Sequence, residues 1–128
     1  MKRRNLEHQH QVAVVEWFAW AHKGLGVPEF ALLAVPNAGA GAQRGQAGKM
    51  KAEGVRSGVP DLLLPVARHA SNGGNGLAIE MKAPDGRVSA SQTEVMAWFR
   101  LQGWRVVVCR SSGEAIDAIK DYLTLPPQ

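Results

Sequence analysis

Three charged residues stand where apolar runs of the sequence begin or end. Asp61 opens a run of three leucines, and Glu80 and Lys82 lie two residues apart in the next apolar run, residues 76–82. Side chains two residues apart on a strand point to the same face, so Glu80 and Lys82 project together. If the two runs pair as antiparallel strands, Asp61 lies next to Glu80 at one edge of a sheet.

Two carboxylates that lie side by side repel each other, and a shared proton or a divalent cation relieves the repulsion. Mg²⁺ suits such a pair, because this hard cation takes oxygen ligands and keeps several of its waters. We therefore predict that Asp61, Glu80 and the backbone carbonyl of Met81 bind a metal ion. Lys82, held beside that ion, would orient an attacking water and offset the negative charge that builds up on a phosphodiester.

The elements that must position these residues follow the order helix, three strands, helix, strand, helix. Helical patterns cover residues 7–22, 89–103 and 111–123, and apolar runs predict strands at residues 29–35, 61–67, 76–82 and 104–109. The turn-rich residues 69–76 favour a hairpin, and the last strand follows a helical crossover, so it must lie parallel to a neighbour. We predict an α/β domain with a mixed sheet flanked by helices, in which residues 29–35 form a buried strand.

Between residues 37 and 58 the composition changes to glycine, alanine and basic residues, which predicts a loop around a short helix near residues 43–52. This segment carries Arg44, Lys49, Lys51 and Arg56. With 15 Lys and Arg against 11 Asp and Glu, the chain has a net charge of +4, which favours a polyanionic partner. The glycine-rich stretch does not match a dinucleotide-binding loop, because Arg44 occupies the place of the third glycine, so no nucleotide cofactor is expected.

Length and cysteine content set the remaining bounds. At 128 residues the chain is long enough for one domain with its own core, residues 1–128. Its single cysteine, Cys109, excludes an internal disulfide and a multi-cysteine zinc site. No stretch approaches the ~20 apolar residues of a membrane span. We expect a cytoplasmic protein.

Glu16 and Gln92 each allow two interpretations. Glu16 is the one charged residue between Val12 and Ala21, where a carboxylate is costly unless it reaches a cation, a donor or solvent. It is therefore either an acid of the site or a residue that faces water. Ser89 and Gln92 have capping-box spacing, so the Gln92 amide either caps its helix or belongs to the site.

Taken together, these features resemble the VRR-NUC domain, the virus-type replication-repair branch of the PD-(D/E)xK nucleases. The resemblance covers residues 7–121 and rests on an ordered set of motifs: Glu16 on its helix, VPN at residues 35–37, KMKAEGVRSGVPDL at residues 49–62, IEMK at residues 79–82 and SASQ at residues 89–92. This ordered set is far more specific than either core motif alone.

The resemblance implies a restriction-endonuclease-like core and phosphodiester cleavage that depends on Mg²⁺ or Mn²⁺. By the match, Asp61 and Glu80 would be metal ligands, Lys82 the catalytic lysine, Glu16 an auxiliary acid and Gln92 a site residue on the following helix. DNA contacts would come from Asn37 together with the four basic residues of the segment around residues 43–56. Stand-alone members, typically of phage origin, resemble dimeric nucleases that act on branched DNA such as four-way (Holliday) junctions.

In a rival interpretation, the protein binds nucleic acid but does not cleave it. In a non-catalytic nucleic-acid-binding module, Arg44, Lys49, Lys51 and Arg56 would contact phosphates while the acids are merely solvated.

For the nuclease, two copies related by a two-fold axis would suit cutting of paired strands, so we expect a homodimer. Those tryptophans that are exposed would contribute to its interface.

Overall fold

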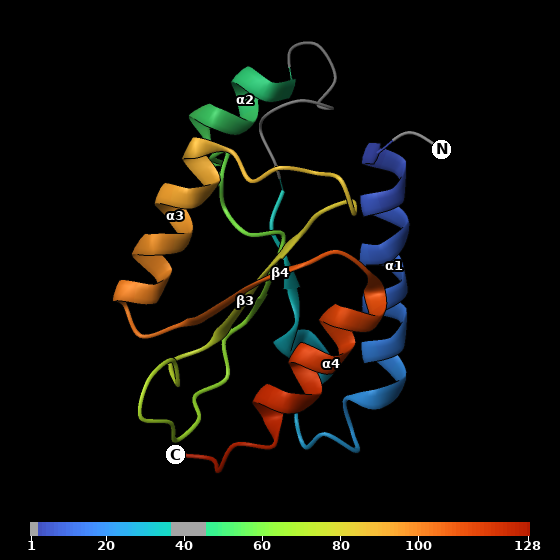
Figure 1. Ribbon diagram of the computed structural model, residues 1–128, viewed down its shortest axis with the longest axis vertical. Coiled ribbons are helices and arrows are strands. Elements are labelled where there is room, and N and C mark those ends of the chain that lie inside the picture. The colour runs from blue at the N-terminus through green and yellow to red at the C-terminus, as the bar shows by residue number, and fades with distance from the viewer. Residues whose placement is uncertain (1–2, 37–45) are drawn as a thin grey trace.

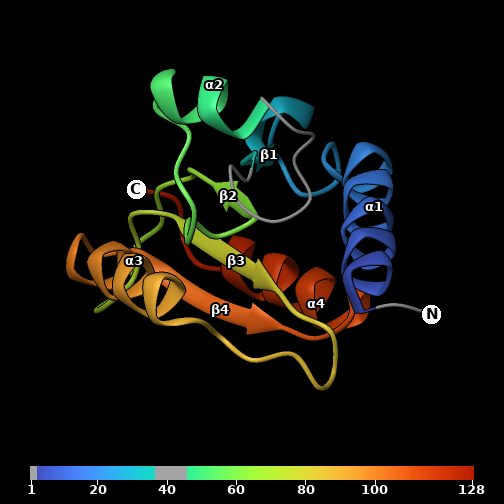
Figure 2. The ribbon, with the colours of Figure 1, turned by 90° about the horizontal axis from the view of Figure 1, so that it is seen from above.

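A mixed sheet forms the middle layer of the computed structural model, which describes residues 3–36 and 46–128 (Figures 1 and 2). The described strands are β1 (Leu33–Ala34), β2 (Leu62–Leu64), β3 (Leu77–Met81) and β4 (Arg105–Cys109), which lie in this order across the sheet. β2 pairs with β1 and β3 in antiparallel fashion, and β4 runs parallel to β3. The predicted α/β class, hairpin and parallel last strand are therefore confirmed.

Helices cover both faces of this sheet. α1 (Arg3–Ala21) and α4 (Ser112–Leu123) pack on one face and α3 (Ala90–Leu101) packs on the other, while α2 (Gln46–Ala52) precedes β2. Among the described helices, none combines the length and the apolarity that crossing a bilayer requires.

The central strand β3 is buried along its whole length. Leu77, Ile79 and Met81 belong to the core with α1 and α4, whereas Ala78 packs in the smaller core with α3. Since side chains alternate along a strand, Glu80 shares the α3 face with Ala78. Burial on both faces explains why this segment is apolar apart from one acid.

The predicted buried strand at residues 29–35 is wrong in its details. Its first half forms a short 3-10 helix, η1 (Glu29–Ala31), and β1 contains just two residues, both exposed. β1 lies at the edge of the sheet, and among the described strands only β2 is its neighbour. β2 is also shorter than predicted, because Pro65 has no N–H to continue the ladder.

Candidate active site

The register of the sheet brings Asp61 and Glu80 together. Leu62 pairs with Ile79, so Asp61, one residue earlier, lies across from Glu80, one residue later. The Asp61 carboxylate accepts a hydrogen bond of 2.8 Å from the backbone N–H of Met81. This bond fixes Asp61 against the end of β3, as the expected pairing of the two apolar runs required.

Glu80 is a buried acid with one unsatisfied oxygen. The residue is 3% exposed, and among the described residues its Oε1 has no hydrogen-bond partner. Burial, with the negative charge of Asp61 as the second cause, raises the pKa of Glu80 to about 8. Burial also raises the pKa of Asp61. Without a cation, the pair therefore holds a proton at neutral pH.

Lys82 supplies the positive charge next to this pair. Its Nζ lies 3.7 Å from Oε2 of Glu80, and its side chain is largely buried. Its backbone N–H donates to the carbonyl of Cys109 at 2.9 Å, which continues the β3–β4 ladder by one residue. The ladder thus sets the direction of the Lys82 side chain, on the same face as Glu80.

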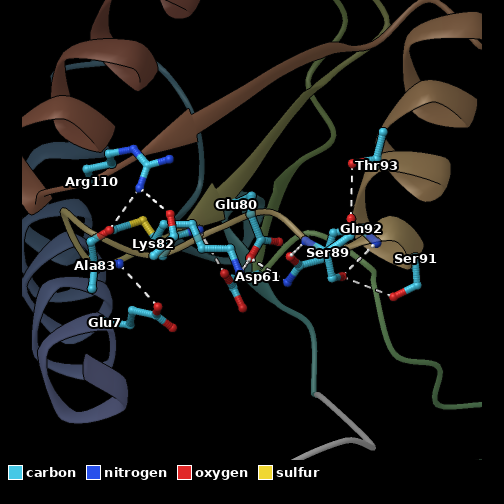
Figure 3. Close-up of polar contacts among 12 residues, drawn as sticks. Glu7, Asp61, Glu80, Lys82, Ala83, Ser89, Ser91, Gln92, Thr93 and Arg110 are labelled. Carbon is cyan, nitrogen blue, oxygen red and sulfur yellow. Dashed lines mark hydrogen bonds and ion pairs between the residues drawn. The ribbon is translucent and has the colours of Figure 1, made fainter. Parts of the chain in front are cut away.

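Gln92 caps its helix and also contacts Glu80. Its backbone N–H donates to Oγ of Ser89 at 3.2 Å, and its Oε1 accepts from the backbone N–H of Ser89 at 2.8 Å, which completes a capping box. Its Nε2 then donates to Oε2 of Glu80 at 3.1 Å. The cap that starts α3 therefore also aims an amide donor at the buried acid, on the α3 side of the site (Figure 3).

From α1 the structure brings Glu7, rather than Glu16, to this edge of the sheet. Oε1 of Glu7 accepts a hydrogen bond of 3.1 Å from the backbone N–H of Ala83, and the charge of Glu7 helps to raise the pKa values of Asp61 and Glu80. Glu16 is exposed and lies about 13 Å further along the helix. The sequence shows that α1 exists but not which of its turns meets β3, which is why Glu7 was missed.

Three of the five predicted DNA-binding residues can be placed. Asn37 and Arg44 lie outside the described residues. Lys49 and Lys51 are exposed on α2, and Arg56 is exposed in the loop that follows it. After Arg56 the chain passes the first turn of α3, where a Cβ added to Gly58 would lie 2.9 Å from the carbonyl oxygen of Ser91. The cations are thus joined to Asp61 by a short segment that is packed against α3.

The donor set fits a hard divalent cation. Two carboxylates lie side by side, one oxygen is buried without a partner, and the pKa of Glu80 shows the cost of leaving the pair uncompensated. In the part of the chain that is described, no three His, Cys, Asp or Glu side chains gather closely enough to hold an ion. Asp61 and Glu80 would therefore share the ion with a backbone carbonyl and waters, as Mg²⁺ prefers.

A mixed sheet with two carboxylates and a lysine at one edge defines the class of restriction-endonuclease-like nucleases. A model of the VRR-NUC domain matches residues 4–113. A solved structure described as a VRR_NUC domain protein is 25% identical, covers 95% of this chain and 91% of its own, and superposes with a TM-score of 0.75. Among curated proteins, none matches. The chain belongs to the VRR-NUC family, a family of nucleases.

Proposed function

We propose that this protein is a DNA endonuclease that depends on Mg²⁺ or Mn²⁺ and cuts branched DNA such as four-way junctions. The observation that carries the proposal is the buried Glu80 carboxyl group, which lies beside Asp61 and Lys82 and keeps one oxygen unsatisfied. Such an arrangement is costly for a protein that only binds nucleic acid, because a buried acid with a raised pKa contributes nothing to contacts with phosphates.

Each residue of the site has a definable task. Asp61, Glu80 and the carbonyl of Met81 would hold the cation, which when bound supplies positive charge to a phosphate oxygen and acidifies a water. Gln92 orients the Glu80 carboxyl group through its amide. Lys82 places a positive charge where negative charge develops on the phosphate and can orient the attacking water. Glu7 adds a third acid at the α1 side of the site.

The DNA contacts are proposed for the exposed cations around α2. Lys49, Lys51 and Arg56 present positive charge to solvent, and the segment after them leads directly to Asp61. Phosphates bound there would lie along the path to the carboxylates, and the binding should weaken with salt as counterions are released. Two copies of the chain would bring two such sites to the two strands of a junction.

The experiment that tests the proposal compares wild type with Asp61→Asn on a labelled four-way junction, with linear duplex and single strand as controls. Each reaction contains Mg²⁺, Mn²⁺ or EDTA. Metal-dependent cuts in the junction that disappear in Asp61→Asn are the expected result. If wild type binds the junction but cuts none of the substrates with either metal, the protein is instead a non-catalytic nucleic-acid-binding module.

A further inference from the structure

The turn that follows Lys82 is held by side chains from two other elements. Arg110, the first residue after β4, donates from Nη1 to the carbonyl of Gly86 at 2.7 Å and to that of Ala83 at 2.9 Å, with the Pro84 carbonyl at 3.4 Å. Glu7 accepts from the N–H of Ala83. Figure 3 shows Arg110 and Glu7 approaching Ala83 from opposite sides, so this residue is fixed through both of its peptide groups.

The parallel register explains why an arginine reaches this turn. Met81 pairs with Cys109, so Arg110 leaves β4 beside the point where Lys82 leaves β3. Ala83 and Gly86 are buried, and buried carbonyls need donors. One guanidinium nitrogen with two protons satisfies both carbonyls and stays charged at any ordinary pH. Arg110 therefore helps to hold the turn between Lys82 and α3, together with the turn's own hydrogen bond of 2.9 Å from the Gly86 N–H to the Ala83 carbonyl.

We propose that Arg110 is a positioning residue of the nuclease site and acts through Ala83 on Glu7. The inference rests on the proposed function. Glu7 belongs to α1, and its hydrogen bond to Ala83 ties its carboxylate to the end of β3. By fixing Ala83 through its carbonyl, Arg110 also steadies the Ala83 N–H that binds Glu7, and so keeps this carboxylate at the α1 side of the site. Loss of Arg110 therefore misplaces Glu7, whereas Asp61 and Glu80, the proposed metal ligands, are unchanged.

A double-mutant cycle separates this role from general stabilisation. The cycle uses wild type, Arg110→Gln, Glu7→Gln and the double variant in single-turnover cleavage of a junction. We expect Arg110→Gln to slow cleavage about 10- to 100-fold, the usual effect of misplacing a group by about 1 Å. In the Glu7→Gln background the same change should have little further effect, since coupled residues are not additive. Effects that multiply across the two backgrounds would overturn the proposal.

Arg110→Lys is the conservative variant of the series. The two strong hydrogen bonds come from one nitrogen, Nη1, so a lysine ammonium, which is charged and only one bond shorter, can restore them, whereas the glutamine amide is neutral and two bonds shorter. We expect Arg110→Lys to cleave within about threefold to tenfold of wild type and to be coupled to Glu7 in the same way. Should Arg110→Gln fail to fold, the cycle is built with Arg110→Lys, whose smaller defect must again vanish beside Glu7→Gln.

Calorimetric titration with Mn²⁺ gives a readout besides activity. Residues that orient the groups around a metal typically change its affinity about 10- to 100-fold, and we expect a weakening of that order in Arg110→Gln. The matched control is Arg105→Gln, at the start of β4, whose guanidinium pairs with Asp121 at 3.0 Å and which should leave Mn²⁺ affinity unchanged. If wild type binds Mn²⁺ but cuts nothing, the proposed function fails, and the titration still decides on Arg110: unchanged affinity in Arg110→Gln overturns its role.

Discussion

At the scale of single residues, Glu80 makes the stability of the metal-free protein depend on pH. Burial and Asp61 raise the pKa of Glu80 from 4.5 to about 8, so its folded form keeps a proton that the unfolded form has lost. The stabilisation is complete below about pH 4.5 and disappears as the pH rises through 8. We expect the free energy of unfolding in EDTA, measured by urea denaturation, to fall by a few kcal/mol across this range.

Glu80→Gln is the control, since an amide does not titrate and keeps nearly the same shape. Its stability in EDTA should overtake that of wild type as the pH rises. Since the proposed cation would bind the ionised pair, Mg²⁺ should stabilise wild type more at pH 8 than at pH 5 and should not stabilise Glu80→Gln in this way. Parallel pH profiles for the two proteins in EDTA would show that Glu80 titrates normally.

The identity of the acid from α1 is a second question at this scale. Glu7 contacts Ala83 beside the site, whereas Glu16 is exposed on the same helix. We expect Glu7→Gln to lower the single-turnover cleavage rate about 10- to 100-fold, within the usual range for a misplaced or missing catalytic group. Glu16→Gln, the same isosteric change at the exposed position, is the control and should cleave at the wild-type rate. A loss confined to Glu16→Gln would restore the assignment made from the sequence.

At the scale of elements, the position of α3 depends on how closely the chain before β2 approaches it. Gly58 has a φ of +88°, and a Cβ there would lie 2.9 Å from the Ser91 carbonyl oxygen. Gly54 has a φ of +98°, with nothing within 4 Å of an added Cβ. Both alanine variants incur the left-handed backbone cost of about 1–2 kcal/mol, and Gly58→Ala adds about 1–3 kcal/mol of overlap.

Activity should separate these glycines further than stability does. The overlap in Gly58→Ala pushes on the first turn of α3, which carries Gln92 toward Glu80. We therefore expect Gly58→Ala, but not Gly54→Ala, to slow junction cleavage under conditions where both proteins are folded. Equal stability losses measured by urea denaturation, with equal rates, would mean that α3 shifts without consequence.

The central elements could be predicted from the sequence because local and tertiary preferences agree there. β3 is an uninterrupted apolar run that the fold buries on both faces, and α3 has its cap and its amphipathic pattern in one segment. The register of Asp61 against Glu80 then follows from the hairpin. Agreement between levels of this kind is what makes a segment predictable.

The periphery could not be predicted, since tertiary contacts decide it. The apolar run before Pro36 predicts a buried strand, yet it lies at the edge of the sheet, with Leu33 46% exposed. The choice between Glu7 and Glu16 depends on which turn of α1 packs beside β3, and nothing local to α1 encodes that turn. Arg110 likewise acquires its partners from a turn that is distant in sequence.

At the scale of the whole molecule, the surface carries exposed apolar side chains as well as the cations around α2. Exposed apolar side chains lie on α1, η1 and β1: Val12, Val15, Trp20, Phe30 and Leu33. Two of them, Val15 and Phe30, border a hollow of about 390 Å³ together with Phe18. Trp20 is 90% and Phe30 78% exposed, so these two rings offer roughly 300 Å² of the ~800 Å² per partner that a stable interface buries.

We expect the exposed apolar side chains of α1, η1 and β1 to hold two copies of the chain together. Wild type should have about twice the 13.8 kDa chain mass in light scattering, and the variant Trp20→Ser with Phe30→Ser should have the mass of one chain. Trp98→Ser with Leu101→Ser, which removes exposed apolar groups from α3, is the matched control and should remain a dimer. Each copy contains one site. The monomeric variant should therefore still cut one strand of a junction at a time but lose the paired cuts in both strands. A monomeric wild type, or a dimer that survives loss of both Trp20 and Phe30, would show that these side chains do not hold two copies together.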